Sequence, residues 1–216
     1  MSRQLSIFDE PPDDGSDPSA DERLARIPDE RVNRSGTVGH TVFFALAAGP
    51  VGAGAIVDLG GRLLRALGAG ANPVEADRLH VSLYDVAHYV DTFAREDASA
   101  AMRAADRLKL SAFEVAFDRI AKFGSGRTAF VFKAGPDEPL RALHDCRNAL
   151  GRALADVGRR TTDAKTTPHM TFAYGAQEIA ETPIEPLRWT AENLVLIDSH
   201  VGGHRHEVLG CWPLRA

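Results

Sequence analysis

Two short segments of the same type place the strongest constraint on how this 216-residue chain can fold. Residues 78–84 read Arg-Leu-His-Val-Ser-Leu-Tyr, and residues 167–175 read Thr-Pro-His-Met-Thr-Phe-Ala-Tyr-Gly. Each contains His-x-Ser/Thr followed by an apolar residue in β-prone surroundings, so both are predicted to be strands. Side chains alternate between the two faces of a strand, so each histidine shares a face with its hydroxyl residue. Because apolar residues take the core, the imidazoles and hydroxyls should face a cleft or solvent.

Brought together, the two polar faces would form one site from His80, Ser82, His169 and Thr171. Two imidazoles can serve as a general base and a general acid in one turnover, because their unperturbed pKa of about 6.5 lies near neutral pH. The hydroxyls can donate hydrogen bonds to an anion held between the imidazoles and stabilise developing charge. This chemistry suits a phosphodiester, and it requires no metal. One such motif alone would indicate little, so the prediction depends on the pair.

The rest of the chain predicts alternating strands and helices. Strands are expected over 37–46, 78–86, 110–121, 128–133, 167–175, 189–197 and 206–212, and helices over 50–67, 97–108 (with Asp97 or Ser99 as its cap) and 137–157. A strand–helix–strand unit that ends in a histidine motif therefore occurs twice. This weak repeat suggests two similar lobes with a cleft between them.

The N-terminal region differs from the rest in composition. Residues 1–30 contain nine Asp/Glu and three Arg, a charge of −6, so the remaining residues sum to about +1 of the total −5. Residues 1–35 are expected to be a largely disordered acidic tail, and residues 36–216 the folded domain. A nearly neutral domain argues against binding long duplexes through many phosphate contacts, but a small local phosphate site stays open.

A short apolar peptide near the start of the tail suggests a partner. Residues 4–8 resemble the peptide that docks bacterial proteins on the replisome's sliding clamp, with Gln4, Leu5, Ile7 and Phe8 as its anchors. The alternative is an incidental apolar start. The chain lacks a long apolar span or a signal-peptide core, and it has only two cysteines with no Cys-x-x-Cys spacing. These features favour a cytoplasmic protein, which we expect to be monomeric.

The remaining histidines predict no metal site. His200, His204 and His206 cluster around a Gly-Gly turn, but without a recognised pattern of metal ligands. The other histidines, for which surface or core positions are expected, are His40, His88 and His144.

The two motifs, in this strand–helix order, resemble the signature of the 2H phosphoesterase superfamily. The chain is most similar to the bacterial 2′-5′ RNA ligase, or RNA 2′,3′-cyclic phosphodiesterase, branch, and residues 43–46 (Phe-Phe-Ala-Leu) and 207–214 are also similar. The resemblance implies a two-lobed α+β fold, with two mainly antiparallel sheets flanking a central cleft and helices outside. It also implies cofactor-free hydrolysis of RNA 2′,3′-cyclic phosphate ends to 2′-phosphates, with reversible 2′-5′ ligation in some members. In that scheme His80 protonates the leaving 3′ oxygen and His169 activates water.

The chain departs from the family pattern at two positions. Ser82 stands where Thr is commoner, and Lys165 stands near the second motif where Arg is common, without Arg's bidentate fork. Arg78 shares the first motif's polar face by a period of two and is another candidate phosphate binder. Tyr84 also falls on that face and could stack on a base, whereas Tyr174 should point into the core.

Two other functions stay open. One is a non-catalytic module that binds RNA ends or the clamp. The other is a cyclic phosphodiesterase that acts on a small nucleotide such as ADP-ribose 1″,2″-cyclic phosphate.

Overall fold

A computed structural model describes residues 19–25, 27, 39–68, 70–124, 128–135, 140–159, 167–200 and 205–215. The clamp-like peptide with Gln4, Leu5, Ile7 and Phe8 lies outside these residues, and so do Lys165 and His204. The described residues form the following elements in order: α1 (Ala20–Ala25), β1 (Gly39–Ala48), α2 (Pro50–Ala66), β2 (Ala71–Pro73), the short 3-10 helix η1 (Ala76–Arg78), β3 (His80–Val90), α3 (Arg95–Ala105), β4 (Phe113–Phe123), β5 (Thr128–Lys133), α4 (Arg141–Asp156), β6 (His169–Gly175), β7 (Thr182–His200) and β8 (Arg205–Pro213).

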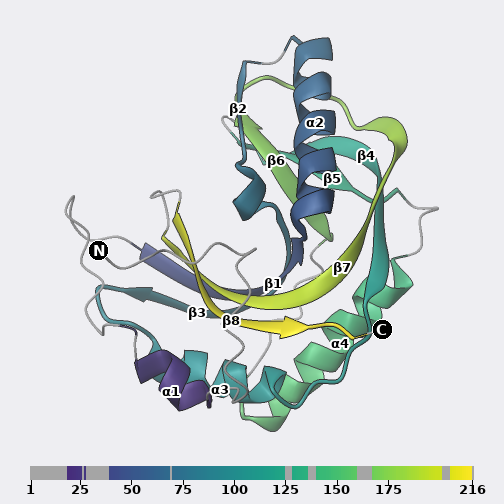
Figure 1. Cartoon of the computed structure of the whole chain (residues 1–216). Coiled ribbons are helices and arrows are strands. Elements are labelled where there is room, and N and C mark those ends of the chain that lie inside the picture. The colour runs from purple at the N-terminus through teal and green to yellow at the C-terminus, as the bar shows by residue number, and fades with distance from the viewer. Residues whose placement is uncertain are drawn as a thin grey trace.

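The strands form two antiparallel lobes that are continuous with each other. Their order is β1-β3-β6-β5-β4-β7-β8, β2 adds to β6, and β7 also pairs with β1. The N-terminal half of β7 pairs with β4, and its C-terminal half pairs with β1 and β8. This long strand therefore runs through both lobes (Figure 1). The two histidine strands, β3 and β6, meet where the lobes join.

Helices lie on the outside of both lobes, as expected for the α+β fold. In Figure 1, α2 stands beside β6 and β7 in the upper lobe, and α1, α3 and α4 lie beneath the lower one. Pro50 occupies the first turn of α2, where its missing N–H costs nothing. Gly158 follows α4 with a φ of +76°, a left-handed conformation that favours glycine after a helix. The expected cap of α3 was wrong, because Ala94 precedes the helix and Asp97 and Ser99 lie within it.

β1 is the central strand of the lower lobe, with β3 and β7 on its two sides. Its alternate residues from Val42 pack into the main core, and Phe43, Ala45 and Ala47 pack with Val195 and Ile197 of β7 in a second cluster. Burial on both faces explains why this segment is almost continuously apolar. The second cluster lies on the side of the sheet that carries His80, because His80 is paired with Ala47.

Within residues 1–35, which were expected to be largely disordered, the structure describes one short helix. Residues 20–25 form α1, and Leu24 is buried in the main core. Arg23 contacts Asp106 at 2.8 Å, and Arg95 donates to the carbonyl oxygens of Leu24 and Ile27 at 2.5 and 2.6 Å. The buried Leu24 and these polar contacts hold α1 against the domain, although its acidic composition did not predict a helix.

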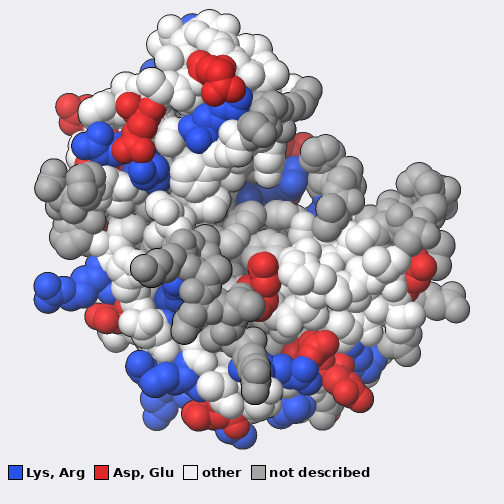
Figure 2. Space-filling view, turned by 180° about the vertical axis from the view of Figure 1, so that it is seen from behind, with Lys and Arg blue, Asp and Glu red and all other residues white. Residues whose placement is uncertain are grey.

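The structure also lengthens the predicted strand over 189–197. β7 begins at Thr182, although prolines, which cannot donate a ladder hydrogen bond, stand at 183 and 186 near its start. Among the described residues, no helix combines the length and apolar character needed to cross a membrane. On the side shown in Figure 2, basic and acidic side chains are interspersed, as the low net charge of the domain suggests.

Candidate active site

A single pairing between the histidine strands brings both motifs onto one face. Val81 of β3 lies opposite Met170 of β6 in an antiparallel ladder, and both side chains are fully buried. The flanking residues therefore point to the other side of the sheet. In this register His80 is the neighbour of Thr171, and Ser82 is the neighbour of His169. The four predicted residues, His80, Ser82, His169 and Thr171, thus form a square on one face, which we call the site face.

The same local hydrogen bond orients the two imidazoles. Nδ1–H of His80 donates to the carbonyl oxygen of Arg78 at 2.7 Å, and Nδ1–H of His169 donates to that of Thr167 at 2.8 Å. A carbonyl oxygen can only accept, so Nδ1 carries the proton in both rings. This leaves Nε2 of each histidine to accept or donate a proton at a bound group.

Each motif is followed by a β-bulge at the equivalent position. Leu83 is the extra residue in β3 opposite β1, and Phe172 is the extra residue in β6 opposite β5. A bulge resets the alternation of side chains beyond it. The prediction that Tyr84 shares the polar face was therefore wrong, since Tyr84 is buried in the core beneath Arg147. The prediction for Tyr174 was wrong for the same reason, and its side chain is 39% exposed.

Arg78 lies beside His80, although not through the expected strand alternation. It ends the 3-10 helix η1, so its backbone carbonyl accepts from His80 while its charge lowers the pKa of that imidazole. Its Nε is buried and has no hydrogen-bond partner within the described ranges. An unpaired guanidinium N–H beside an imidazole suits the binding of a phosphate oxygen. Lys165, the other candidate cation, lies outside the described residues.

His206 is a member of the site that the motifs did not reveal. It lies on β8 opposite Ser199, and its ring is 5.2 Å from that of His80 and 6.0 Å from that of Phe43. Phe43 in turn packs 5.2 Å from His80, and Phe123 packs 4.8 Å from His169. The sequence places Phe43 in a predicted strand and His206 in a histidine cluster near a turn, but neither position predicts contact with His80, because that contact depends on long-range strand pairing.

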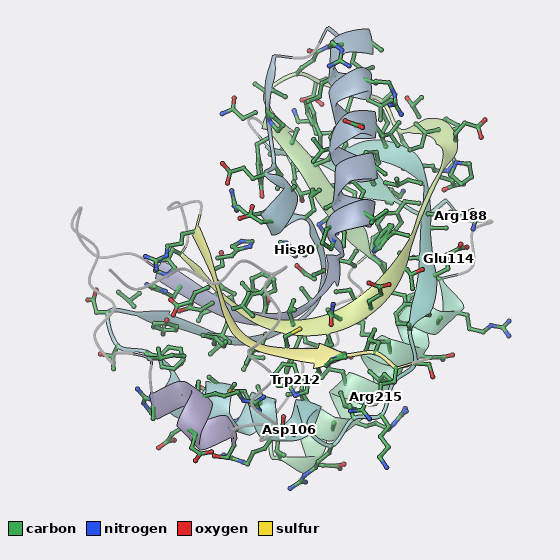
Figure 3. All side chains as sticks on the ribbon, viewed as in Figure 1. His80, Asp106, Glu114, Arg188, Trp212 and Arg215 are labelled. Atoms are coloured by element: carbon green, nitrogen blue, oxygen red, sulfur yellow. The ribbon has the colours of Figure 1, made fainter. Side chains whose placement is uncertain are left out.

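The adjacent imidazoles of His80 and His206 are held in the neutral form. Burial lowers the pKa of His80 to about 4, and the charges of Arg78 and His169 lower it further, against a raising effect of the Arg78 carbonyl. Burial also lowers the pKa of His206 to about 3, with contributions from the charges of His80, Arg78 and His200. Both effects arise because a charged imidazole is poorly solvated here. Figure 3 shows His80 at the junction of the upper and lower lobes.

The comparisons with known proteins agree with this geometry. The family model described as the 2′-5′ RNA ligase superfamily matches residues 62–203, a stretch that includes both histidine motifs. The chain belongs to this superfamily. Membership in the 2′-5′ RNA ligase superfamily, a group of 2H phosphoesterases, supports a phosphoesterase or ligase activity. A search of curated protein sequences gave no match.

Several solved structures have the same fold as this chain. Escherichia coli LigT in its apo form is 21% identical with a TM-score of 0.60, over 83% of this chain and 99% of LigT. A phosphoesterase is 22% identical with a TM-score of 0.60, over 82% of this chain and 99% of its own. The protein TT0787 of Thermus thermophilus is 19% identical with a TM-score of 0.59, over 82% of this chain and 98% of its own.

Proposed function

We propose that this protein hydrolyses RNA 2′,3′-cyclic phosphate ends to 2′-phosphates, and that a 5′-hydroxyl can take the place of water in a reversible 2′-5′ ligation. The observation that carries the proposal is the pairing of Val81 with Met170, which places two imidazoles and two hydroxyls on one face. This arrangement provides an acid, a base and neutral donors for the phosphate oxygens within one site. The family membership limits the chemistry to phosphoester or ligase reactions.

The reaction can be written for named atoms. Nε2 of His169 takes a proton from water as the water oxygen attacks phosphorus, and the bond between phosphorus and O3′ breaks. Nε2–H of His80 gives its proton to O3′, which leaves as a hydroxyl. Ser82 and Thr171 donate hydrogen bonds to the non-bridging oxygens, and Arg78 neutralises part of their charge. These groups supply both proton transfers, so the step needs no metal ion.

The role of His80 as an acid requires a change in its ionisation. With a pKa of about 4 it is neutral at pH 7 before the substrate binds. An anionic phosphate placed beside an imidazole favours the charged form and raises its pKa. Binding of inorganic phosphate should therefore take up a proton near pH 6. Calorimetry in buffers of different ionisation enthalpy measures this uptake, and binding without proton uptake would contradict the role of His80 as the acid.

The named ligands of a solved neighbour favour a nucleotide substrate. E. coli LigT has been crystallised with phosphate, with 3′-AMP and with ATP. A phosphate site beside a nucleoside pocket would suit an RNA end in the present protein too. We place the nucleobase of the RNA end near Phe123, whose half-buried ring lies 4.8 Å from that of His169. Phe123 thus takes the stacking role expected of Tyr84, which is buried.

One assay tests the proposed activity directly. Purified protein is given an oligonucleotide that ends in 2′,3′-cyclic phosphate, in the presence of EDTA, and the 2′-phosphate product is quantified. We expect His80→Ala and His169→Ala each to reduce the rate roughly 1000-fold or more. His88→Ala is the matched control, because His88 is an exposed histidine further along β3. Equal rates for wild type and the double histidine variant would refute the proposal.

The same assay separates the other candidate functions. ADP-ribose 1″,2″-cyclic phosphate is offered in parallel, and a preference for it would move the substrate class to small nucleotides. Binding of cyclic-phosphate RNA without turnover would indicate a non-catalytic module. Recruitment to the sliding clamp through residues 4–8 is tested by deleting residues 1–10, which should abolish clamp binding.

A further inference from the structure

A second polar cluster lies on the opposite face of the sheet from His80. His40 of β1 is paired directly with His200 of β7, and Asp198 precedes His200 by two residues on the same face. The alternate residues of β1 on this face, beginning with Val42, pack into the main core. His40 and Asp198 are buried, and His200 is half-buried. The strand register thus fixes three metal-ligating side chains at one end of the lower lobe.

The donor atoms are close enough to share one ion. One ligand atom from each of the three residues lies within 4.8 Å of the others. Nδ1 of His40 is 3.2 Å from Oδ1 of Asp198. Two ligands at ordinary Zn–N and Zn–O lengths in a tetrahedron are about 3.3 Å apart, so this pair already has the required spacing. The ring of the half-buried His200 lies 4.3 Å from that of His40, centroid to centroid.

The surroundings of Asp198 resemble the outer shell of a metal site. Tyr89 donates from its hydroxyl to Oδ2 at 2.5 Å, which orients the carboxylate and leaves Oδ1 directed at His40. Tyr89 also stacks on the imidazole of His40, with ring centroids 4.6 Å apart. The Tyr89 hydroxyl oxygen is also 3.1 Å from Nδ1 of His40, so Tyr89, His40 and Asp198 form one connected polar network.

We propose that His40, Asp198 and His200 bind a zinc ion that stabilises this end of the sheet. Two imidazoles and one carboxylate are a common donor set for zinc, and a divalent cation would compensate the buried carboxylate. The ion would lie on the face opposite Ser82 and His80, so it has no part in the ring-opening step. Its removal by EDTA lowers the stability of the protein, whereas the reaction on the site face continues.

Metal binding to the full-length protein tests this proposal. The protein is stripped by dialysis against a chelator and titrated with Zn²⁺ by calorimetry, and with Co²⁺ by visible absorption. We expect one ion per chain, a tetrahedral Co²⁺ spectrum and a thermal midpoint that rises with added Zn²⁺. Asp198→Asn and His200→Asn should each weaken Zn²⁺ binding by roughly 100-fold or more, and Tyr89→Phe by roughly 10-fold.

Two control variants separate this site from others. His144→Asn removes an exposed histidine of α4, and His169→Asn removes an imidazole of the site face; neither should change Zn²⁺ binding. Asp198→Asn could disturb the core, so His200→Asn is the deciding variant, because His200 is only half-buried. Circular dichroism checks that this variant is folded. Zinc binding that survives His200→Asn, or that is lost in His169→Asn, would overturn the proposal, and so would no binding by the wild type.

Discussion

At the scale of single residues, His80 and His169 have similar local geometry but different surroundings. Both donate through Nδ1 to the carbonyl two residues earlier. Only His80 is also enclosed by Phe43 and His206, and burial is the main cause of its lowered pKa. Residues of β1 and β8 therefore help to lower the pKa of His80, an effect that the sequence of the first motif alone does not predict.

His206→Ala should raise the pKa of His80. The substitution admits water to the imidazole, and because burial is the main cause of its lowered pKa, better hydration favours imidazolium. We expect a rise of about 1 unit from the wild-type value toward 6.5. NMR titration of the His80 ring measures it, with His144→Ala as a control on the distant helix α4. An unchanged titration would mean that His206 does not shield His80.

Ser82 and Thr171 should contribute similarly to catalysis, because they occupy equivalent positions on the site face. Ser82→Ala and Thr171→Ala should each lower kcat/KM about 100-fold by removing a donor to the phosphate. Ser82→Thr keeps the hydroxyl and should retain activity within about 3-fold of wild type, since Thr also restricts its rotamer. Steady-state kinetics on the cyclic-phosphate oligonucleotide distinguish these outcomes. Loss of activity in Ser82→Thr would indicate that space, not the hydroxyl, matters there.

At the scale of elements, periodicity predicted the two histidine strands and the order of the main helices, but not the bulges. Alternation placed His80 and Ser82 correctly, because they precede the extra residue Leu83. Beyond it the same rule failed at Tyr84, and Phe172 caused the matching failure at Tyr174. A bulge depends on how two strands pair, and a single strand's composition contains no signal for that pairing.

The packing of α1 gives a prediction at the same scale. Leu24→Ala should lower the free energy of unfolding by about 2–4 kcal/mol, because it removes a side chain only 1% exposed in the core. The ring-opening rate should stay unchanged, since α1 contacts α3 and β8, away from the site face. Urea denaturation and the kinetic assay check both points. Val51→Ala is the control, as Val51 is 90% exposed on α2 and should cost little.

At the scale of the whole molecule, the active site forms because the two lobes are continuous. β7 belongs to both lobes, and β3 meets β6 through Val81 and Met170. Each lobe contributes one histidine and one hydroxyl residue, so neither lobe can form the site face alone. The sequence repeat predicted two lobes, but the strand predicted over 189–197 lacked the first part of β7, which pairs with β4 and joins the lobes.

The burial of His80 at this junction makes global stability depend on pH. The folded pKa of His80 is about 4 and the unfolded value is about 6.5, so between these values the unfolded chain binds more protons. The free energy of unfolding should therefore be highest above about pH 6.5 and fall as the pH drops toward 4. His80 alone accounts for up to about 3 kcal/mol of that loss, because one pKa unit corresponds to about 1.4 kcal/mol. Urea denaturation of metal-free protein across this range should show a shallower slope for His80→Asn than for wild type or the exposed-site variant His88→Asn. Parallel slopes for all three proteins would mean that His80 is as well hydrated in the folded state as in the unfolded chain.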